Sequence, residues 1–171
     1  STIIITHSIA ILSLPFGWVG FRGITTTLGK DRFECILAFA LMSLGLVAVM
    51  IAAATNGLIL PIYLQDYKDV SPETIESIRP ILRYGFAINQ AFDYIYTFAF
   101  CLAILCLSIA ILRTKNLPVW LGWLGIVVSI SAAVLFISGI ATQNLNGLRI
   151  FVTSIIVWVA LVGWSMVRSE A

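Results

Sequence analysis

Long apolar runs with few charged residues constrain this chain more than any other feature of its sequence. The clearest run begins at Phe33 and continues unbroken through Ala54. A helix needs ~20 mostly apolar residues to cross the ~30 Å hydrocarbon core of a bilayer, and this run is long enough. Of the 171 residues, 60% are hydrophobic and only 11% are charged, which is more apolar surface than a soluble core of this size can bury. The sequence therefore predicts an all-α integral membrane protein.

The apolar runs predict a five-span helical bundle that forms one transmembrane domain over residues 1–171. We expect spans at about residues 2–21, 33–56, 85–112, 117–141 and 148–167. The first run lacks the positively charged region and the small-residue cleavage site of a signal peptide, so we interpret it as a span. A four-span bundle without this first run is the alternative.

Polar stretches between the runs predict the connections. Residues 22–32 contain glycines and threonines and indicate a loop. Residues 65–83 indicate an outer polar loop, in which the Ser-Pro-Glu sequence at residues 71–73 predicts the start of a short surface helix. Residues 116–118 predict a tight turn between the third and fourth spans. The Asn, Gly and Pro residues within positions 56–61 predict a weakening or bend of the second span.

The distribution of Lys and Arg predicts the orientation, because positive residues are retained on the cytoplasmic side. With five spans, one side receives Arg22, Lys30, Arg32, Arg113, Lys115 and Arg168. The other side receives Lys68, Arg79, Arg83 and Arg149. We therefore expect the N-terminus outside and the C-terminus inside. Tryptophans agree with this orientation, since amphipathic rings favour the headgroup region. Those near the proposed inner boundary are Trp18, Trp120, Trp123 and Trp164.

Charge, cysteine and histidine content limit the functions that the chain can have. The formal net charge of +2, without a run of Lys or Arg, indicates no nucleic-acid partner. Cys35, Cys101 and Cys106 fall in apolar runs without the paired spacing of a zinc site, so we interpret them as packing residues. His7 is the only histidine, which excludes ligation of haem by two histidines of one chain. We predict no cofactor, no metal site and no catalytic residue.

Polar residues inside the third span form a candidate site. Asn89 and Asp93 are four residues apart and share one helical face, with Gln90 and Tyr94 beside them. An ionisable residue inside a membrane costs ~2.5 to 3.5 kcal/mol on insertion scales, which makes Asp93 a functional candidate. Counting back from the end of the span places Asp93 at the outer edge of the hydrocarbon. An interfacial carboxylate, or hydrogen bonds that pack helices, is therefore the alternative interpretation.

Two further polar residues, His7 and Asn56, fall in the same outer leaflet as this group. Polar side chains in spans turn toward the bundle interior or toward water. We therefore expect an outward-facing, ligand-binding pocket lined by His7, Asn56, Asn89, Gln90, Asp93 and Tyr94. Polar residues that merely mark helix ends would cluster in the same way, and both interpretations stay open.

Small residues in the fourth span predict close packing between helices. They are Gly122, Gly125, Ser129 and Ala133. Contact inside the bundle is one interpretation of this stripe. A homo-oligomer or a partner subunit is the other.

The segment LPVWLGWLG at residues 117–125, after a basic turn at residues 113–115, carries a resemblance to a known family. It resembles a hairpin of uncharacterised bacterial multipass membrane proteins of a domain-of-unknown-function type. The resemblance covers roughly the C-terminal half of the chain. It implies a location in a bacterial inner membrane, and it implies no activity.

We expect a non-enzymatic protein that acts as an accessory or assembly subunit of a larger membrane complex, or as an oligomer. Short loops and the lack of catalytic donors favour this function. The first alternative is a binding or transport protein whose outward pocket accepts a lipid or small amphiphile. The second alternative is a membrane enzyme with Asp93 as acid or base. The expected partners are membrane lipids and either a protein subunit or further copies of the chain.

Overall fold

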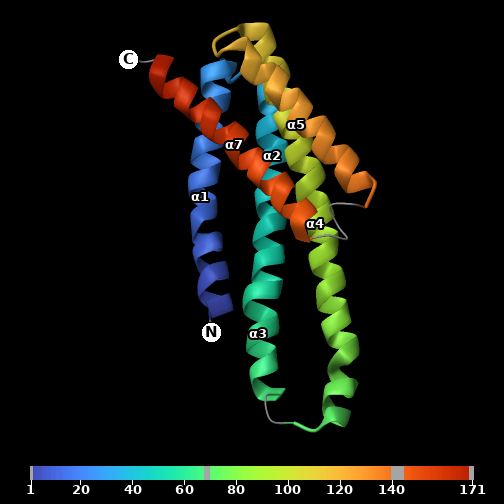
Figure 1. Cartoon of the computed structure of the whole chain (residues 1–171). Helices are drawn as coiled ribbons and strands as arrows, with labels where there is room; N and C mark the ends of the chain where they lie inside the picture. Colours follow the sequence, from blue (N-terminus) through green and yellow to red (C-terminus); the bar gives the residue numbers. More distant parts are fainter. Residues whose placement is uncertain (1, 68–69, 140–144, 170–171) are drawn as a thin grey trace. The chain divides into compact units, whose positions relative to one another are not determined.

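Every regular element that the structure describes is a helix. The computed structural model describes residues 2–67, 70–139 and 145–169 (Figure 1). In chain order, the elements are α1 (Thr2–Gly29), α2 (Phe33–Ala54), the π-helical turn η1 (Thr55–Ile59), α3 (Leu60–Tyr63), the 3₁₀ turn η2 (Leu64–Tyr67), α4 (Pro72–Thr114), α5 (Val119–Ile137) and α7 (Leu145–Ser169). Over these residues the expected all-α architecture is confirmed.

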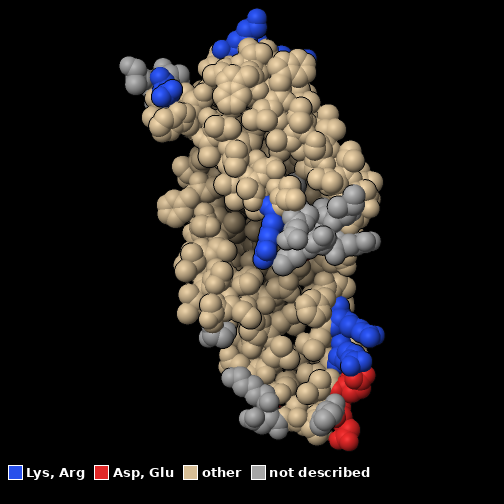
Figure 2. Space-filling view, in the orientation of Figure 1, with Lys and Arg blue, Asp and Glu red and all other residues tan. Residues whose placement is uncertain are grey.

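Four helical segments in this described part of the chain are long and apolar enough to cross a membrane. They are Thr2–Gly29, Phe33–Tyr67, Glu73–Thr114 and Val119–Ile137, and the last helix, α7, has a shorter apolar part at Val152–Arg168. Large apolar side chains lie on the outside of these helices, and Leu12 and Phe16, for example, are 72% and 79% exposed. Charged side chains occupy only small parts of the face seen in Figure 2. Because soluble proteins rarely expose so much apolar surface, these helices have the length and surface of membrane-spanning helices.

The chain divides into two compact units. Unit 1 comprises Ser1–Gly17 and Leu44–Tyr96, and unit 2 comprises Trp18–Ser43 and Thr97–Ala171. Unit 1 contains the start of α1, the end of α2 with the π-helical turn, and the first part of α4. Unit 2 contains the remaining parts of these helices together with α5 and α7. Each unit therefore joins segments that are far apart in the sequence.

The first helix is longer than the sequence predicts. The loop expected at residues 22–32 is wrong for most of its length, because α1 continues to Gly29 and only residues 30–32 form a turn. Ile24 and Leu28 are buried on one face of this extension. The threonine hydroxyls of the extension donate to backbone carbonyls three or four residues earlier, so they are satisfied within the helix. Gly29 ends the helix at a φ of +111°, in the left-handed region that favours glycine.

The outer polar loop expected at residues 65–83 is also largely helical. Its helix start is confirmed, since the Thr74 amide donates to the Ser71 hydroxyl at 3.4 Å. The expected short surface helix, however, is not separate, because α4 continues from this start without a break into the third apolar run. Ile78 is buried, which holds this first part of α4 against its unit. Residues 68 and 69 of the predicted loop lie outside the described residues.

The remaining connections follow the sequence more closely. The tight turn expected at residues 116–118 is confirmed as the link between α4 and α5. The fourth span was expected to reach residue 141, which lies outside the described residues, and α5 itself ends at Ile137. Gly139 follows this end at a φ of +77°, as is common after the last turn of a helix.

At one end of unit 2, the turn between α1 and α2 contacts the turn between α4 and α5. The Asn116 side-chain amide donates to the Thr27 carbonyl at 2.9 Å, and Arg113 forms an ion pair with Glu34. Arg32 also reaches Glu34, at 3.6 Å. These contacts hold the α1–α2 turn beside the α4–α5 turn. Basic residues from both turns are therefore gathered at one end of unit 2.

The small residues of α5 lie where α4 approaches it. A Cβ atom on Gly122 would lie 3.0 Å from the Ser108 carbonyl oxygen, and one on Gly125 would lie 2.1 Å from the Ser108 hydroxyl oxygen. Ser129 is also buried, whereas Ala133 is partly exposed. The absence of side chains at the two glycines therefore allows two helices of the same chain to pack closely.

Trp158 fixes α7 against the same part of α5. Its side chain is fully buried, and its indole N–H donates to the Leu121 carbonyl at 2.9 Å. A Cβ atom on Gly125 would lie 2.7 Å from the indole nitrogen. Gly125 is thus the position at which α4, α5 and α7 all meet.

Gly125→Ala is expected to destabilise the protein, because the new Cβ atom would meet both Ser108 and Trp158. Overpacking of this kind costs about 1 to 3 kcal/mol, so the melting temperature of the purified protein in detergent should fall by several degrees. Gly163→Ala in α7 is the matched control, since no atom lies within 4 Å of its Cβ position. The control should leave the melting temperature unchanged or raise it, because alanine favours a helix more than glycine does. Equal melting temperatures for the two variants would contradict this packing.

Candidate functional site

A π-helical turn interrupts the helix between α2 and α3 in unit 1. The Leu60 amide donates to the Thr55 carbonyl, five residues earlier, instead of to Asn56. With the same five-residue spacing, the Asn56 carbonyl would accept from the backbone N–H of residue 61. Residue 61 is a proline, which has no N–H. The backbone carbonyl of Asn56 is therefore without an amide partner in this described turn. The Asn, Gly and Pro residues that were expected to weaken or bend the second span lie in or just after this turn, and π-helical turns are frequent at functional sites.

The Asn56 side chain adds a second uncompensated oxygen. Its Oδ1 atom is buried and has no hydrogen-bond partner among the described residues. A buried polar atom without a partner costs ~1 to 3 kcal/mol, so such atoms are rare in native structures and require an explanation. Two oxygens of Asn56 are thus able to accept a hydrogen bond or to bind a cation.

His7 of α1 packs directly on this turn. A Cβ atom on Gly57 would lie 2.0 Å from Cγ of His7, so the histidine occupies the space beside the glycine. The Nδ1–H group of His7 donates to the Ile3 carbonyl at 2.9 Å, since a carbonyl can only accept. The structure therefore places His7 next to the turn that contains Asn56.

Asn89 and Asp93 of α4 form a hydrogen-bonded pair in the same unit. Asn89 Nδ2 donates to Asp93 Oδ2 at 2.8 Å, and both side chains are half-buried. They follow Gly85 at helical spacing, and a Cβ atom on Gly85 would lie 3.0 Å from the Leu60 side chain. The two helices run antiparallel (Figure 1), and Leu60 comes about one turn after Asn56. This register places Asn56 and Asn89 at about the same level.

The other two residues expected in the pocket lie on a different face of α4. Gln90 is exposed, and Tyr94 is 40% exposed. Gln90 directly follows Asn89, and Tyr94 directly follows Asp93. Successive side chains in an α-helix point in directions that differ by about 100°. His7 and Asn56 therefore lie at the π-helical turn, Asn89 lies at about the level of Asn56, and Asp93 lies one helical turn further along α4.

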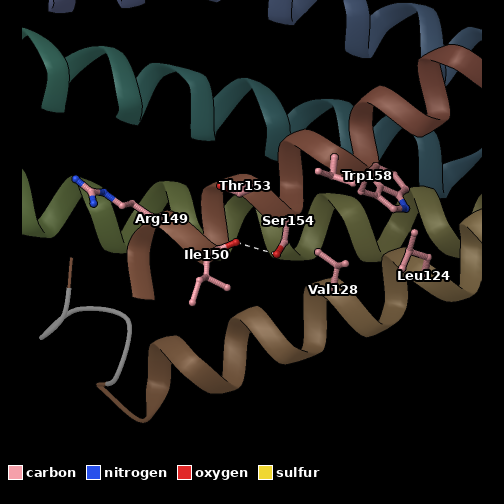
Figure 3. Close-up of a pocket in the computed structure, with 8 residues that line it drawn as sticks. Leu124, Val128, Arg149, Ile150, Thr153, Ser154 and Trp158 are labelled. Carbon is pink, nitrogen blue, oxygen red and sulfur yellow. Dashed lines mark hydrogen bonds between the residues drawn. The ribbon is translucent and has the colours of Figure 1, made fainter. Parts of the chain in front are cut away.

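Unit 2 contains a groove of about 470 Å³ between α5 and α7 (Figure 3). Arg149 lies at one end of the groove and Trp158 at the other. The Ser154 hydroxyl donates to the Ile150 carbonyl at 2.8 Å, so its hydrogen-bonding capacity is largely used within α7. The complete lining consists of Leu124, Val128, Arg149, Ile150, Thr153, Ser154, Val157 and Trp158. Arg149 thus supplies the charge of a groove whose walls are mostly apolar.

Sequence reasoning did not identify this groove, although Trp158 carried a signal. It is the tryptophan in the middle of the fifth apolar run, away from both predicted membrane boundaries. A tryptophan at such a position needs an acceptor for its indole N–H inside the protein. Periodicity within one helix, however, cannot identify that acceptor as Leu121 in another helix.

Among the described residues, metal-binding side chains are not concentrated at the π-helical turn of unit 1 or at the groove of unit 2. Among the described residues, no group of three or more His, Cys, Asp or Glu residues is placed to hold a metal ion. Cys35 and Cys101 are buried as free thiols, and Cys106 is partly buried. An ion at the Asn56 turn would therefore depend on carbonyl and amide oxygens more than on the ligands typical of zinc.

Comparison with known proteins gives no match: no family model, curated protein or solved structure matches the chain. The resemblance of residues 117–125 to uncharacterised bacterial membrane proteins therefore stays a prediction. The function has to be inferred from the geometry of the two units.

Gly57→Ala is expected to displace His7 and to lower the melting temperature, because overpacking costs about 1 to 3 kcal/mol. His7→Gly in the same chain removes the clash, because Cβ of His7 would also lie 2.2 Å from the new Cβ atom. The double variant should therefore be more stable than the separate effects of the two substitutions predict. Gly20→Ala is the control, since no atom lies within 4 Å of its Cβ position. Thermal unfolding in detergent measures Gly57→Ala, His7→Gly, the double variant and Gly20→Ala. Strictly additive effects of the substitutions at positions 7 and 57 would show that the two residues do not pack together.

Proposed function

We propose that the chain is an integral membrane protein of five spans, with its N-terminus outside and its C-terminus inside a bacterial inner membrane. α7 has 25 residues, a length of about 37 Å at the rise of an α-helix, which is enough to cross. The basic end of unit 2 supports the orientation, because positive loops are retained in the cytoplasm. The basic residues of its two turns are Lys30, Arg32, Arg113 and Lys115.

Single cysteines introduced at the helix ends test this topology. We expect a membrane-impermeant maleimide to label Asp66→Cys and Arg149→Cys on intact cells. It should label Lys115→Cys and Arg168→Cys only after permeabilisation. The unmodified protein controls for labelling of its own cysteines. If Arg149→Cys and Arg168→Cys are labelled from the same side, α7 does not cross and the bundle has fewer than five spans.

We further propose that the protein binds an anionic phospholipid, with one acyl chain in the groove between α5 and α7. The observation that carries this proposal is the combination of apolar walls with one arginine at the end of the groove (Figure 3). The volume of about 470 Å³ falls within the range of small-molecule sites. Arg149 is exposed and can form charge-assisted hydrogen bonds with a phosphate group. The walls can bury part of the acyl chain.

The other expected functions receive less support from the geometry. Gly122 and Gly125 pack against helices of the same chain, so they support contact inside the bundle and not contact with a partner. The role of an accessory subunit or an oligomer stays a prediction. An enzyme that uses Asp93 stays a prediction as well, and the contact described for this carboxylate is the Asn89 amide.

Binding of defined lipids to the delipidated protein tests the proposal. We expect phosphatidylglycerol to bind about fivefold more tightly than phosphatidylcholine with the same acyl chains, because one basic residue at a lipid headgroup contributes ~1 kcal/mol. Arg149→Gln should remove this preference. Arg83→Gln, which changes an exposed arginine of α4, is the control and should retain it. Native mass spectrometry measures the number of bound lipids at each concentration.

The apolar part of the groove has its own test. Val128→Trp is expected to fill the groove and to reduce the binding of both lipids. Val127→Trp is the matched control, because Val127 is 59% exposed and does not line the groove. Equal affinity of the wild type for the two lipids, or an unchanged preference in Arg149→Gln, would overturn the proposal.

A further inference from the structure

The π-helical turn of unit 1 presents oxygens that the surrounding helices do not satisfy. The Asn56 carbonyl lacks an amide partner because of Pro61, and Asn56 Oδ1 is buried without a partner in the described part of the chain. Carbonyls of unwound helices in membrane proteins are known ligands for Na⁺. We propose that Asn56 and Asp93 together form a binding site for one monovalent alkali cation.

Asp93 supplies the negative charge for this site. It is the only acidic residue between Glu76 and Glu170. Its described contact is the neutral amide of Asn89, and none of the ion pairs in the described part of the chain involves it. A half-buried carboxylate without a counter-charge is unfavourable. One monovalent cation neutralises it, whereas a divalent cation would leave a net positive charge in the same surroundings.

The neighbouring side chains orient and cover the site. Asn89 Nδ2 binds Asp93 Oδ2 at 2.8 Å, which leaves the other carboxylate oxygen available to a cation. The contact between Gly85 and Leu60 sets the register that brings α4 to the level of the π-helical turn. His7 packs against the turn at Gly57 from the side of α1. Hard cations prefer oxygen ligands of this kind, and water molecules complete their coordination.

The cation site is independent of the lipid groove. It lies in unit 1, and it shares no residue with the groove of unit 2. Failure of lipid binding would therefore leave the cation proposal unaffected, and the reverse is also true.

Equilibrium binding of radioactive Na⁺ to the intact protein in detergent, and competition by K⁺, test the proposal. The protein is first exchanged into N-methyl-D-glucamine chloride, and ionic strength is kept constant. We expect saturable binding of about one ion per chain, in line with the single charge of Asp93. Saturable thermal stabilisation by the same cation should accompany it, because a ligand of the folded state raises the melting temperature.

Four variants separate this site from non-specific binding. Asp93→Asn should weaken binding at least about tenfold, because it removes the charged ligand. Pro61→Ala should also weaken binding, since the new backbone amide of residue 61 can donate to the Asn56 carbonyl. Removal of a proline from a helix favours folding, so misfolding would not explain weaker binding by this variant. Asn56→Asp combined with Asp93→Asn moves the charge to the turn and should restore saturable binding. Asp66→Asn removes an exposed carboxylate of unit 1 and should bind as the wild type does.

The binding measurements either support the cation site or overturn it. Saturable binding that is lost in Asp93→Asn and regained in the double variant supports the site, because a variant that merely misfolds does not regain binding when a second substitution is added. Absence of saturable binding of both Na⁺ and K⁺ to the folded wild type overturns the proposal. Wild-type affinity in both Asp93→Asn and Pro61→Ala overturns it as well.

Discussion

A polar group surrounded by hydrocarbon has to find its hydrogen bond inside the protein, and most features of this structure follow from that constraint. Helices satisfy the backbone within each segment. Many side-chain hydroxyls are satisfied by the same helices, because they donate to carbonyls three or four residues earlier. This pattern is found at Thr6, Ser13, Thr26, Thr55, Thr114 and Ser154. A serine or threonine can therefore occupy an apolar helix without a polar partner in another helix.

Trp158 shows how the same constraint connects helices. Its indole N–H cannot reach a carbonyl of its own helix, and it donates instead to Leu121 of α5. The approach requires that Gly125 have no side chain, since a Cβ atom there would lie 2.7 Å from the indole nitrogen. The contact between α5 and α7 is therefore fixed at Trp158, and the groove extends from this point to Arg149 (Figure 3). A requirement for one hydrogen bond thus also determines where the groove between α5 and α7 begins.

Features that depend on one segment could be predicted from the sequence, and features that depend on two segments could not. The apolar runs predicted the helices, and the spacing of Asn89 and Asp93 predicted that they share one helical face, because both are local properties. The loop expected at residues 22–32 was wrong because composition does not show that threonine hydroxyls are satisfied within a helix. The pairing of His7 with Gly57 and that of Trp158 with Gly125 depend on the register between helices, which periodicity within one helix does not contain.

Asn56 is the clearest exception to the constraint on polar groups, and the chemistry of its side chain explains why. The hydroxyls of Thr97 and Ser108 are also buried without a described partner, but a hydroxyl can rotate and donate to a carbonyl of its own helix. The Oδ1 atom of an asparagine can only accept, and the amides in the middle of a helix are already used by the backbone. Pro61 accounts for the free carbonyl of Asn56 but not for the burial of its Oδ1 atom. Two separate causes therefore leave two acceptors on one residue, and only a donor or a cation from outside the helix can satisfy both.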